Sequence, residues 1–334
     1  MIKKILKRKQ PEKKIPTRIT NDTLAEHREQ VLAGGRKHKY PLQYTKHRLV
    51  WNTVIIGTVS VLLVAVLVWV QLYVWRDTSE LAYRITRFIP LPVASVDGYP
   101  VRYSEYLLQR RGTMTVLEKQ GQANATDKVV FKQQEAMDVA VKSAYARKLA
   151  REHGVTVSQQ EVDDILQRQQ KETGLSRAAY DAAIRDRLGW SPEEMREALE
   201  SALLVMAVSF KVDTAALDTA NTVQSSIKQG KSLTDISTAL GQRVQFVPQV
   251  TVPKNNADGG LTAAAANLEK GKTSDMIKTR AGDGYYFVTL QEKTDTTVTY
   301  SYIRVPLTAF QQSLEQLKKD NKISYHIALE KPGQ

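Results

Sequence analysis

The sequence predicts an α+β protein with a single transmembrane helix, a helical lobe and a small α/β lobe. Three features of the 334 residues support this prediction. Residues 49–75 carry no charge and are long enough for a bilayer core of about 30 Å, which takes roughly 20 helical residues to cross. Apolar residues then recur at intervals of three and four through residues 103–210, as on one face of a helix. After residue 213, helical stretches alternate with runs rich in aromatic and β-branched residues, which are typical of strands.

The net charge of +13 is concentrated at the N-terminal end of the chain. Residues 1–48 hold 14 Lys and Arg against 4 Asp and Glu, a net of +10, which leaves +3 for the rest. The part outside this tail is therefore not expected to bind nucleic acid. The sequence has no cysteine, which excludes disulfides, thiolate chemistry and cysteine-ligated zinc. No cofactor and no metal site are expected.

The apolar run predicts a single-pass membrane protein. Trp51 lies near one end of the run, and Trp69, Tyr73 and Trp75 lie near the other, like the aromatic residues at the two surfaces of a bilayer. The run is too long, and starts too far into the chain, for a cleaved signal peptide. We therefore expect residues 49–75 to contact the lipid bilayer.

Basic residues cluster just before the apolar run, and this cluster predicts the orientation of the chain. By the positive-inside rule, the tail (residues 1–48) is cytoplasmic and residues 76–334 are extracytoplasmic. The tail includes KKILKRKQPEKK at residues 3–14. It is expected to lie on anionic lipid or to stay disordered.

The elements of the helical lobe follow from local signals. Residues 76–92 are predicted as a juxtamembrane linker, in which the helix of the span continues until Pro90 stops it. A strand at residues 93–96 and a turn at Asp97-Gly98 precede a helix that starts at Tyr103. A long helix is expected over residues 128–152, ended by Gly154.

Two further helices begin at capping boxes. Ser158 and Ser191 are each followed three residues later by a glutamate, so the serine and the glutamate can satisfy the free amides of the first turn. Gly174 and Ser176 mark a stop and a restart between these two helices. The second capped helix is expected to end near Phe210.

The order in the smaller lobe is helix, helix, strand, short helix and strand. Helices are predicted over residues 214–227 and within 227–241, a strand over 244–252 and a short helix over 262–270. Asp283-Gly284 then turns into the strand at residues 285–290. Residues 298–331 are predicted to form strand, helix and strand.

Two stretches in the helical lobe resemble a known family. VASVDGYPVRYSEY resembles the opening strand and first helix of the SurA-type chaperone domain, shared by the SurA, PpiD and PrsA foldases of bacterial envelopes. FKQQEAMDVAVKSAYARKLAREHGVTVSQQEVDDIL resembles the long helix and the start of the helix after it. The resemblance covers residues 93–212. It implies that residues 298–334 pack back on this domain, with one of their strands pairing near residues 93–96.

Residues 213–297 are similar to a parvulin, the rotamase domain that often accompanies a SurA-type domain. The similarity rests on a helix near Gly230, the loop Asp258-Gly259-Gly260-Leu261, a turn near Gly271 and the strand after Gly284. Parvulins accelerate rotation about X–Pro bonds with a pair of histidines in an apolar pocket. Here Tyr286 stands in place of the final-strand histidine. The first strand of the family has no counterpart ahead of Gly230.

The nearest match to that first strand is YSYIRVPL at residues 300–307, where Tyr302 replaces the histidine. This stretch follows the domain instead of preceding it. The resemblance thus implies a degenerate parvulin, with Tyr286 and Tyr302 as weak catalytic candidates. Outside the tail the only histidines are His153 and His326, which are distant in sequence.

Alternation along the strand puts Tyr285 and Tyr286 on opposite faces of the sheet. One is expected to face the core and the other to face solvent or a client peptide. Larger side chains of both lobes are the peptide-binding candidates. These candidates are Tyr103, Tyr106, Met137, Tyr145, Met206, Phe210 and Tyr286.

The function predicted from the sequence is a membrane-anchored extracytoplasmic chaperone or foldase. It would bind unfolded or newly exported polypeptides without ATP, because the sequence has no phosphate loop. The sequence also has no GxSxG or HExxH motif, so no hydrolase chemistry is indicated. Two alternatives stay open. One is an active parvulin-type prolyl isomerase, and the other is a structural bitopic protein of the cell envelope.

Overall fold

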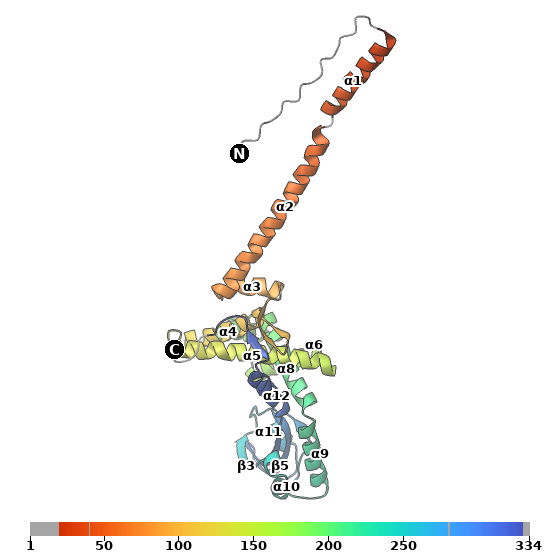
Figure 1. Cartoon of the computed structure of the whole chain (residues 1–334). Helices are drawn as coiled ribbons and strands as arrows, with labels where there is room; N and C mark the ends of the chain where they lie inside the picture. The colour runs from red at the N-terminus through yellow and green to blue at the C-terminus, as the bar shows by residue number, and fades with distance from the viewer. Residues whose placement is uncertain (1–19, 40, 280, 330–334) are drawn as a thin grey trace. The chain divides into compact units, whose positions relative to one another are not determined.

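The computed structural model describes residues 20–39, 41–279 and 281–329 (Figure 1). They belong to two compact units, Met1–Gln71 and Leu72–Gln334. In the first unit the described residues form two helices and the start of a π-helical turn. These elements are α1 (Asn21–Lys39), α2 (Pro41–Trp69) and η1 (Val70–Val74).

One helical stretch in the described part, Leu49–Val74, is long and apolar enough to cross a membrane. It coincides with the apolar run of the sequence, and its side chains are exposed along the hydrophobic window. Helix α1 lies in the basic tail, where the sequence predicted no helix. The basic stretch at residues 3–14 lies outside the described residues.

In the second unit, seven helices and a three-stranded antiparallel sheet form what we call the helical lobe. Its helices are α3 (Glu80–Phe88), α4 (Tyr103–Lys119), α5 (Thr126–His153), α6 (Gln159–Thr173), α7 (Arg177–Leu188), α8 (Pro192–Val212) and α12 (Ala309–Lys319). Its sheet has the order β2-β1-β7, with β1 (Pro92–Val96), β2 (Tyr99–Arg102) and β7 (Ile323–Tyr325).

Both predicted capping boxes are present. Ser158 and Ser191 accept hydrogen bonds from the amides of Glu161 and Glu194, and each glutamate side chain returns to the serine amide. Gly154 ends α5 in the left-handed conformation (φ 64°), which costs glycine little because it has no Cβ. These helix boundaries are thus set by capping serines, glutamates and a glycine that can be recognised in the sequence.

The predicted helical linker between the span and Pro90 is wrong. The chain leaves the helix at residues 75–79, where Arg76 has a positive φ of 52°. The Asp77 side chain accepts from the Ser79 amide (2.8 Å), and Ser79 caps the separate helix α3 through the Ala82 amide (3.2 Å). The polar sequence Asp77-Thr-Ser79 competes with the helix for its own amides, which explains the break.

Strand β2 was not predicted. Asp97 and Gly98 both have positive φ, 46° and 76°, as the tightest hairpin turns require. This turn folds residues Tyr99–Arg102 back onto β1, so the helix that begins at Tyr103 is preceded by a hairpin.

The remaining elements of the second unit form what we call the sheet lobe. It contains α9 (Thr214–Lys228), α10 (Leu233–Leu240), α11 (Leu261–Ala266), β3 (Gln245–Pro253), β4 (Ile277–Lys278), β5 (Gly284–Lys293) and β6 (Thr297–Pro306). Its four strands are antiparallel in the order β3-β6-β5-β4. In Figure 1 this lobe, with α9 and α10, lies beyond α8 and α12.

The chain crosses between the two lobes at one place. One carboxylate oxygen of Asp213 accepts from the Ala216 amide at the start of α9 (2.9 Å). The other accepts from the amides of Thr308 (2.6 Å) and Ala309 (3.0 Å), where the chain returns. Strand β7 then pairs with β1, which is the pairing predicted between a C-terminal strand and residues 93–96.

Candidate functional site: a groove between four helices

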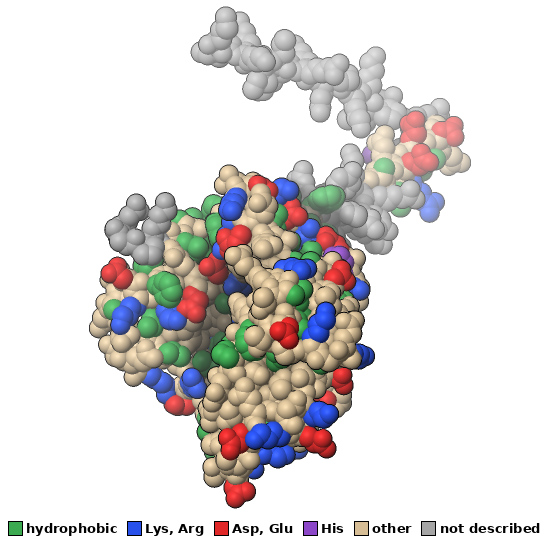
Figure 2. Space-filling model, turned by 90° about the horizontal axis from the view of Figure 1, so that it is seen from below, with side chains coloured by type: hydrophobic (Ala, Val, Ile, Leu, Met, Phe, Trp, Pro, Cys, Tyr) green, Lys and Arg blue, Asp and Glu red, His purple; other side chains and the backbone are tan. Residues whose placement is uncertain are grey.

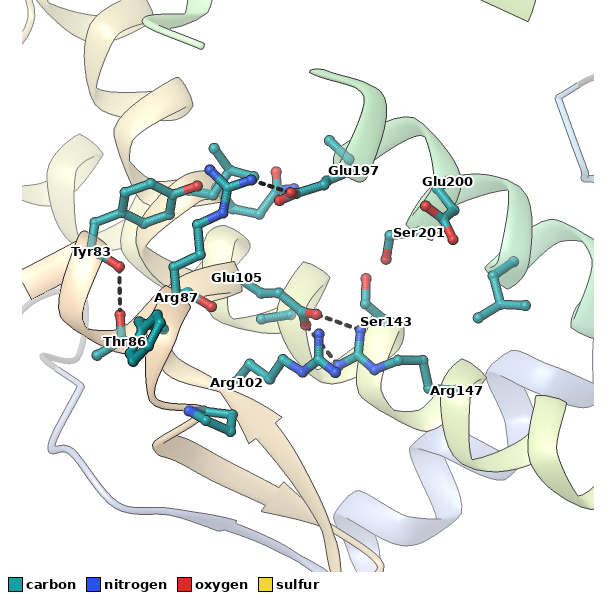
Figure 3. A pocket seen from close by; sticks show the side chains of 18 residues that line it. Tyr83, Thr86, Arg87, Arg102, Glu105, Ser143, Arg147, Glu197, Glu200 and Ser201 are labelled. Carbon is teal, nitrogen blue, oxygen red and sulfur yellow. Dashed lines mark hydrogen bonds and ion pairs between the residues drawn. The ribbon is translucent and has the colours of Figure 1, made fainter. Parts of the chain in front are cut away.

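A groove of about 490 Å³ opens on the helical lobe between α3, α4, α5 and α8 (Figure 3). Helix α3 and the residues after it contribute Tyr83, Thr86, Arg87, Phe88 and Pro90. The last residue of β2 contributes Arg102, and α4 contributes Ser104, Glu105, Leu108 and Gln109. The other wall comes from α5 and α8, with Ala140, Ser143, Arg147, Glu197, Ala198, Glu200, Ser201 and Leu204. In Figure 3, Ser143 of α5 and Ser201 of α8 point toward one another across it.

A buried carboxylate fixes α3 beside the groove. Glu194, on the first turn of α8, forms an ion pair with Arg111 of α4 (2.5 Å) and accepts a hydrogen bond from the Tyr83 hydroxyl of α3. The Arg111 guanidinium also lies over the Tyr83 ring, 4.7 Å from its centroid. Burial and then the charge of Glu194 raise the pKa of the Tyr83 hydroxyl, which therefore stays protonated as a donor.

Two ion pairs join the walls of the groove. Arg147 of α5 donates two hydrogen bonds to Glu105 of α4, at 2.5 and 2.8 Å, the bidentate geometry that suits a guanidinium and a carboxylate. Arg87 of α3 donates to Glu197 of α8. The Arg147 pair is mostly buried, whereas the Arg87 pair is about half exposed and is expected to contribute little stability.

Two charged side chains of the groove have no such partner. Neither the Arg102 side chain nor the Glu200 side chain forms a hydrogen bond or ion pair with another residue in the described part of the chain. In Figure 3 the guanidinium groups of Arg102 and Arg147 extend toward each other near Glu105. The groove therefore offers one cation and one anion to a ligand.

The groove also has an apolar lining. Leu108, Ala140 and Leu204 lie along its walls, and Phe88 stands at its edge. The Phe88 side chain is 90% exposed, an unusual position for a phenylalanine. The site is thus a mixed groove with an exposed aromatic rim.

The predicted peptide-binding residues are not at this surface. Five of them are buried in the cores of the two lobes: Tyr103, Tyr106, Met137, Tyr145 and Tyr286. Met206 and Phe210 are partly buried and pack toward other residues of the fold, Phe210 against the Tyr285 ring at 5.1 Å. None of the seven lines the groove.

The buried tyrosines have structural contacts instead. The Tyr103 hydroxyl donates to the carbonyl of Leu72 (2.9 Å), and its ring meets that of Tyr73 edge to face. Burial raises the pKa of the Tyr103 hydroxyl, which is thereby kept as a donor. These contacts attach the π-helical turn η1 to the start of α4.

Tyr285 and Tyr286 lie on opposite faces of β5, as predicted. Tyr285 packs in one apolar cluster with Phe287, whereas Tyr286 packs in a second cluster with Val288. The expectation that one of them faces solvent or a client is wrong, because both are buried. The sheet has helices on both faces, with α9 and α10 on one and α11 on the other.

Tyr286 and Tyr302 do come together. Their rings lie 5.5 Å apart on the neighbouring strands β5 and β6. The Tyr286 hydroxyl donates to Asp283 (2.7 Å), and burial and this carboxylate raise the pKa of the hydroxyl. His153 ends α5 and His326 follows β7, both exposed, and neither lines the groove.

The groove residues were not predicted from the sequence, because none of them belongs to a catalytic motif. Only the sequence pattern around Phe88 indicated part of this site. It lies seven residues after Leu81, beside Arg84 and Arg87, so a short amphipathic helix ahead of Pro90 was readable. The pairing of Glu105 with Arg147 joins residues of two helices and had no local signal.

Comparison of the sequence with known protein families identifies the family of this chain. Residues 43–209, half of the chain, match the family described as the SurA-like N-terminal domain. The chain belongs to this family, and the matched residues include both the apolar span and the four helices of the groove. The family is of the chaperone and foldase type and typical of proteins outside the cytoplasm. No curated protein matches the sequence.

Proposed function

We propose that this protein is a membrane-anchored extracytoplasmic chaperone that binds unfolded, newly exported polypeptides in the groove between α3, α4, α5 and α8. The observation that carries the proposal is an open groove within a SurA-like domain, with apolar side chains on its walls and two unpaired charges. A groove of about 490 Å³ has room for a short stretch of chain and none for a folded domain.

The side chains of the groove suit a ligand without a fixed sequence. Leu108 and Leu204 offer apolar surface to the side chains of a client. Arg102 donates to backbone carbonyls, and Glu200 accepts from backbone amides, which every polypeptide presents. Binding therefore depends on the client being unfolded, because folded chains bury both their apolar side chains and their backbone groups.

One face of the molecule shows charges of both signs. Figure 2 shows Lys and Arg interspersed with Asp and Glu over the face drawn, with hydrophobic side chains between them. A mixed surface of this kind does not select clients by net charge.

The span supports an anchor close to the site of export. The stretch Leu49–Val74 provides the helix, and the cluster of basic residues before it favours a cytoplasmic N-terminus. Anchoring keeps the groove at the membrane surface, where clients emerge unfolded. We propose residues 76–334 as the extracytoplasmic part, built of the helical lobe and the sheet lobe.

Blocking the groove tests the proposal. In the full chain, reconstituted in lipid nanodiscs, Ala198→Trp fills the groove wall, whereas Ala183→Trp places the same side chain on an exposed face of α7 outside the groove. We expect Ala198→Trp to weaken suppression of the aggregation of a chemically denatured client, measured by light scattering, and Ala183→Trp to leave it unchanged. Equal suppression by both variants, at equal thermal stability, would contradict client binding in the groove.

A prolyl isomerase is the second candidate, on one observation. The strand β6, which carries Tyr302, lies beside β5 in the centre of the sheet, where it brings the tyrosine to Tyr286. Against activity, the Tyr286 hydroxyl is committed to Asp283 and the side chain is buried. A gain in the rate of proline-limited refolding that Tyr286→Phe abolishes would favour the isomerase.

A further inference from the structure

Helix α3 has two faces of different character. Ala82, Tyr83 and Thr86 are buried against the helical lobe. On the outer face, Leu81 is 58% exposed and Phe88 90% exposed, and Ile89, just after the helix, is 50% exposed. Leu81 and Phe88 are seven residues apart, so they lie on the same side of the helix. A nine-residue helix thus presents an apolar stripe that no described part of the chain covers.

Cations border this stripe. Arg84 lies between Leu81 and Phe88, with 76% of its side chain exposed, and its exposed pair with Glu80 (3.2 Å) is weak. Arg76 and Trp75 precede the helix, and both are exposed. Apolar side chains flanked by arginine, with tryptophan nearby, are the composition of a helix that lies in a membrane interface.

The position of α3 in the chain identifies what covers the stripe. The apolar span ends at Val74 and α3 begins at Glu80, so five residues connect them. Five extended residues reach at most about 18 Å. The end of the span is itself held by the helical lobe, because the Tyr73 hydroxyl donates to the Pro92 carbonyl (2.7 Å) and the Tyr103 hydroxyl to the Leu72 carbonyl (2.9 Å).

We propose that α3 lies in the lipid–water interface at the outer surface of the membrane, with Leu81, Phe88 and Ile89 inserted among the acyl chains. Arg76 and Arg84 then contact the phosphates of anionic headgroups. The proposal rests on the anchoring given under the proposed function and goes beyond it, because it assigns a lipid-binding surface to the folded lobe itself.

This arrangement has a consequence for the groove. Phe88 also forms the edge of the groove, and Tyr83, Thr86 and Arg87 of the same helix line it. With α3 in the interface, the groove opens beside the membrane surface, where a client is still extended.

Spin labels on the full chain test the proposal. Because the sequence has no cysteine, single substitutions Leu81→Cys and Ile89→Cys carry one nitroxide each. Leu217→Cys, on α9 of the sheet lobe and 36% exposed, is the control. In nanodiscs that hold one chain each, we expect the labels at 81 and 89 to collide with oxygen dissolved in lipid and to be shielded from a water-soluble nickel chelate. The label at 217 is expected to show the reverse.

A second change tests the strength of the contact. Phe88→Ser is expected to lower the ratio of docked to undocked α3 about tenfold, because one aromatic side chain no longer leaves water. Nickel collisions at position 81 then rise. Discs that contain phosphatidylglycerol are expected to shield position 81 more strongly than discs of phosphatidylcholine alone.

Labels at 81 and 89 that collide with nickel as freely as the label at 217 would overturn the proposal. Shielding from both reagents in single-chain discs would overturn it as well, since protein and not lipid would then cover the stripe. Failure of the anchor is a separate result: alkaline carbonate would then extract the whole chain from membranes. A chain that resists extraction but has water-exposed labels refutes only the lipid contact of α3.

Discussion

At the scale of single residues, Glu194 connects three helices through one carboxylate. One oxygen contacts Arg111 (2.5 Å), the other accepts from the Ser191 amide (2.7 Å), and the Tyr83 hydroxyl donates to the same group. Burial on its own raises the pKa of Glu194, but the hydrogen bonds from Arg111 and Ser191 outweigh it, so the pKa lies below its ordinary value of 4.5. The folded state therefore holds this carboxylate ionised.

The lowered pKa gives a prediction with a definite sign. Because the folded protein binds this proton less readily than the unfolded chain, the contribution of Glu194 is fully present above pH 4.5 and is lost as the pH falls through the folded pKa. Glu194→Gln removes the charge, and we expect the free energy of unfolding at neutral pH to fall by about 2 kcal/mol. The difference from the wild type should shrink on acidification.

Urea unfolding at pH 7 and below pH 4.5 measures both effects. Glu200→Gln is the matched control, since Glu200 has no ion pair with another described residue. A Glu194→Gln variant as stable as this control at pH 7 would show that the carboxylate does not hold the three helices.

Asp213 is the second residue on which several elements depend. Its two oxygens accept three amides, from Ala216, Thr308 and Ala309, and so cap α9 and hold the segment before α12. We expect Asp213→Ala to lower the free energy of unfolding by about 2–3 kcal/mol, because three amides lose their acceptor at two points of the chain. Thermal unfolding measures the loss, with Ser232→Ala, which removes a single exposed cap at α10, as the smaller reference.

At the scale of elements, the structure shows which signals the sequence carries. The helices that start after Ser158 and Ser191 were predicted correctly, because the serine and the glutamate of each capping box lie within four residues of each other. The strand β5 and its two faces were readable from alternation. The short strand β2 and the separate helix α3 were not predicted. The break before α3 depends on the Asp77 side chain, which competes with a helix for a backbone amide, and β2 depends on a hairpin turn in which Asp97 has a positive φ.

Local sequence signals do not predict the groove, because its contacts join residues that are far apart in the sequence. Glu105 meets Arg147 across two helices, and Glu194 meets Tyr83 across a hundred residues of chain. The large side chains chosen as peptide-binding candidates, such as Tyr103 and Met137, are instead those that a core requires. Size and aromaticity alone do not separate a core from a binding surface.

The packing of α4 against Trp190 gives a prediction at this scale. Gly112 lies inside α4, where alanine ordinarily stabilises a helix by up to about 1 kcal/mol. Here a Cβ would lie 2.9 Å from the Trp190 ring, which is buried and donates to the Leu108 carbonyl (3.0 Å). We therefore expect Gly112→Ala to destabilise the protein by about 1–3 kcal/mol.

A double-mutant cycle isolates this contact. In the background of Trp190→Phe, whose smaller ring leaves space, Gly112→Ala should cost less or become stabilising. Equal costs in the two backgrounds, measured by chemical unfolding, would show that the ring does not oppose the new methyl group.

At the scale of the whole second unit, elements from its beginning and from its last described part pack together in the helical lobe. Strand β7 pairs with β1, and Phe310 of α12 packs on Tyr145 of α5 with ring centroids 5.3 Å apart. The sheet lobe is inserted between α8 and α12, and its two connections meet at Asp213. None of the residues that line the groove comes from this insertion.

This topology predicts that the sheet lobe is dispensable for folding of the helical lobe. The Asp213 carboxylate and the Thr308 amide lie 2.6 Å apart, so a short glycine–serine linker can replace residues 214–306. The deletion exposes Phe210, which packs on Tyr285, so Phe210 is changed to serine in the same variant. We expect this chain to keep its helical circular dichroism and its suppression of client aggregation.

A chain that ends at Leu307 is the matched control. It keeps the sheet lobe but loses α12 and β7, and with them the buried side chains of Phe310, Leu314 and Leu317. Each such side chain contributes about 1.5–3 kcal/mol, and their sum is comparable to the whole stability of a domain. Loss of helical structure in the deletion variant, with a stable Leu307-terminated chain, would reverse the assignment and make the sheet lobe the support of the groove.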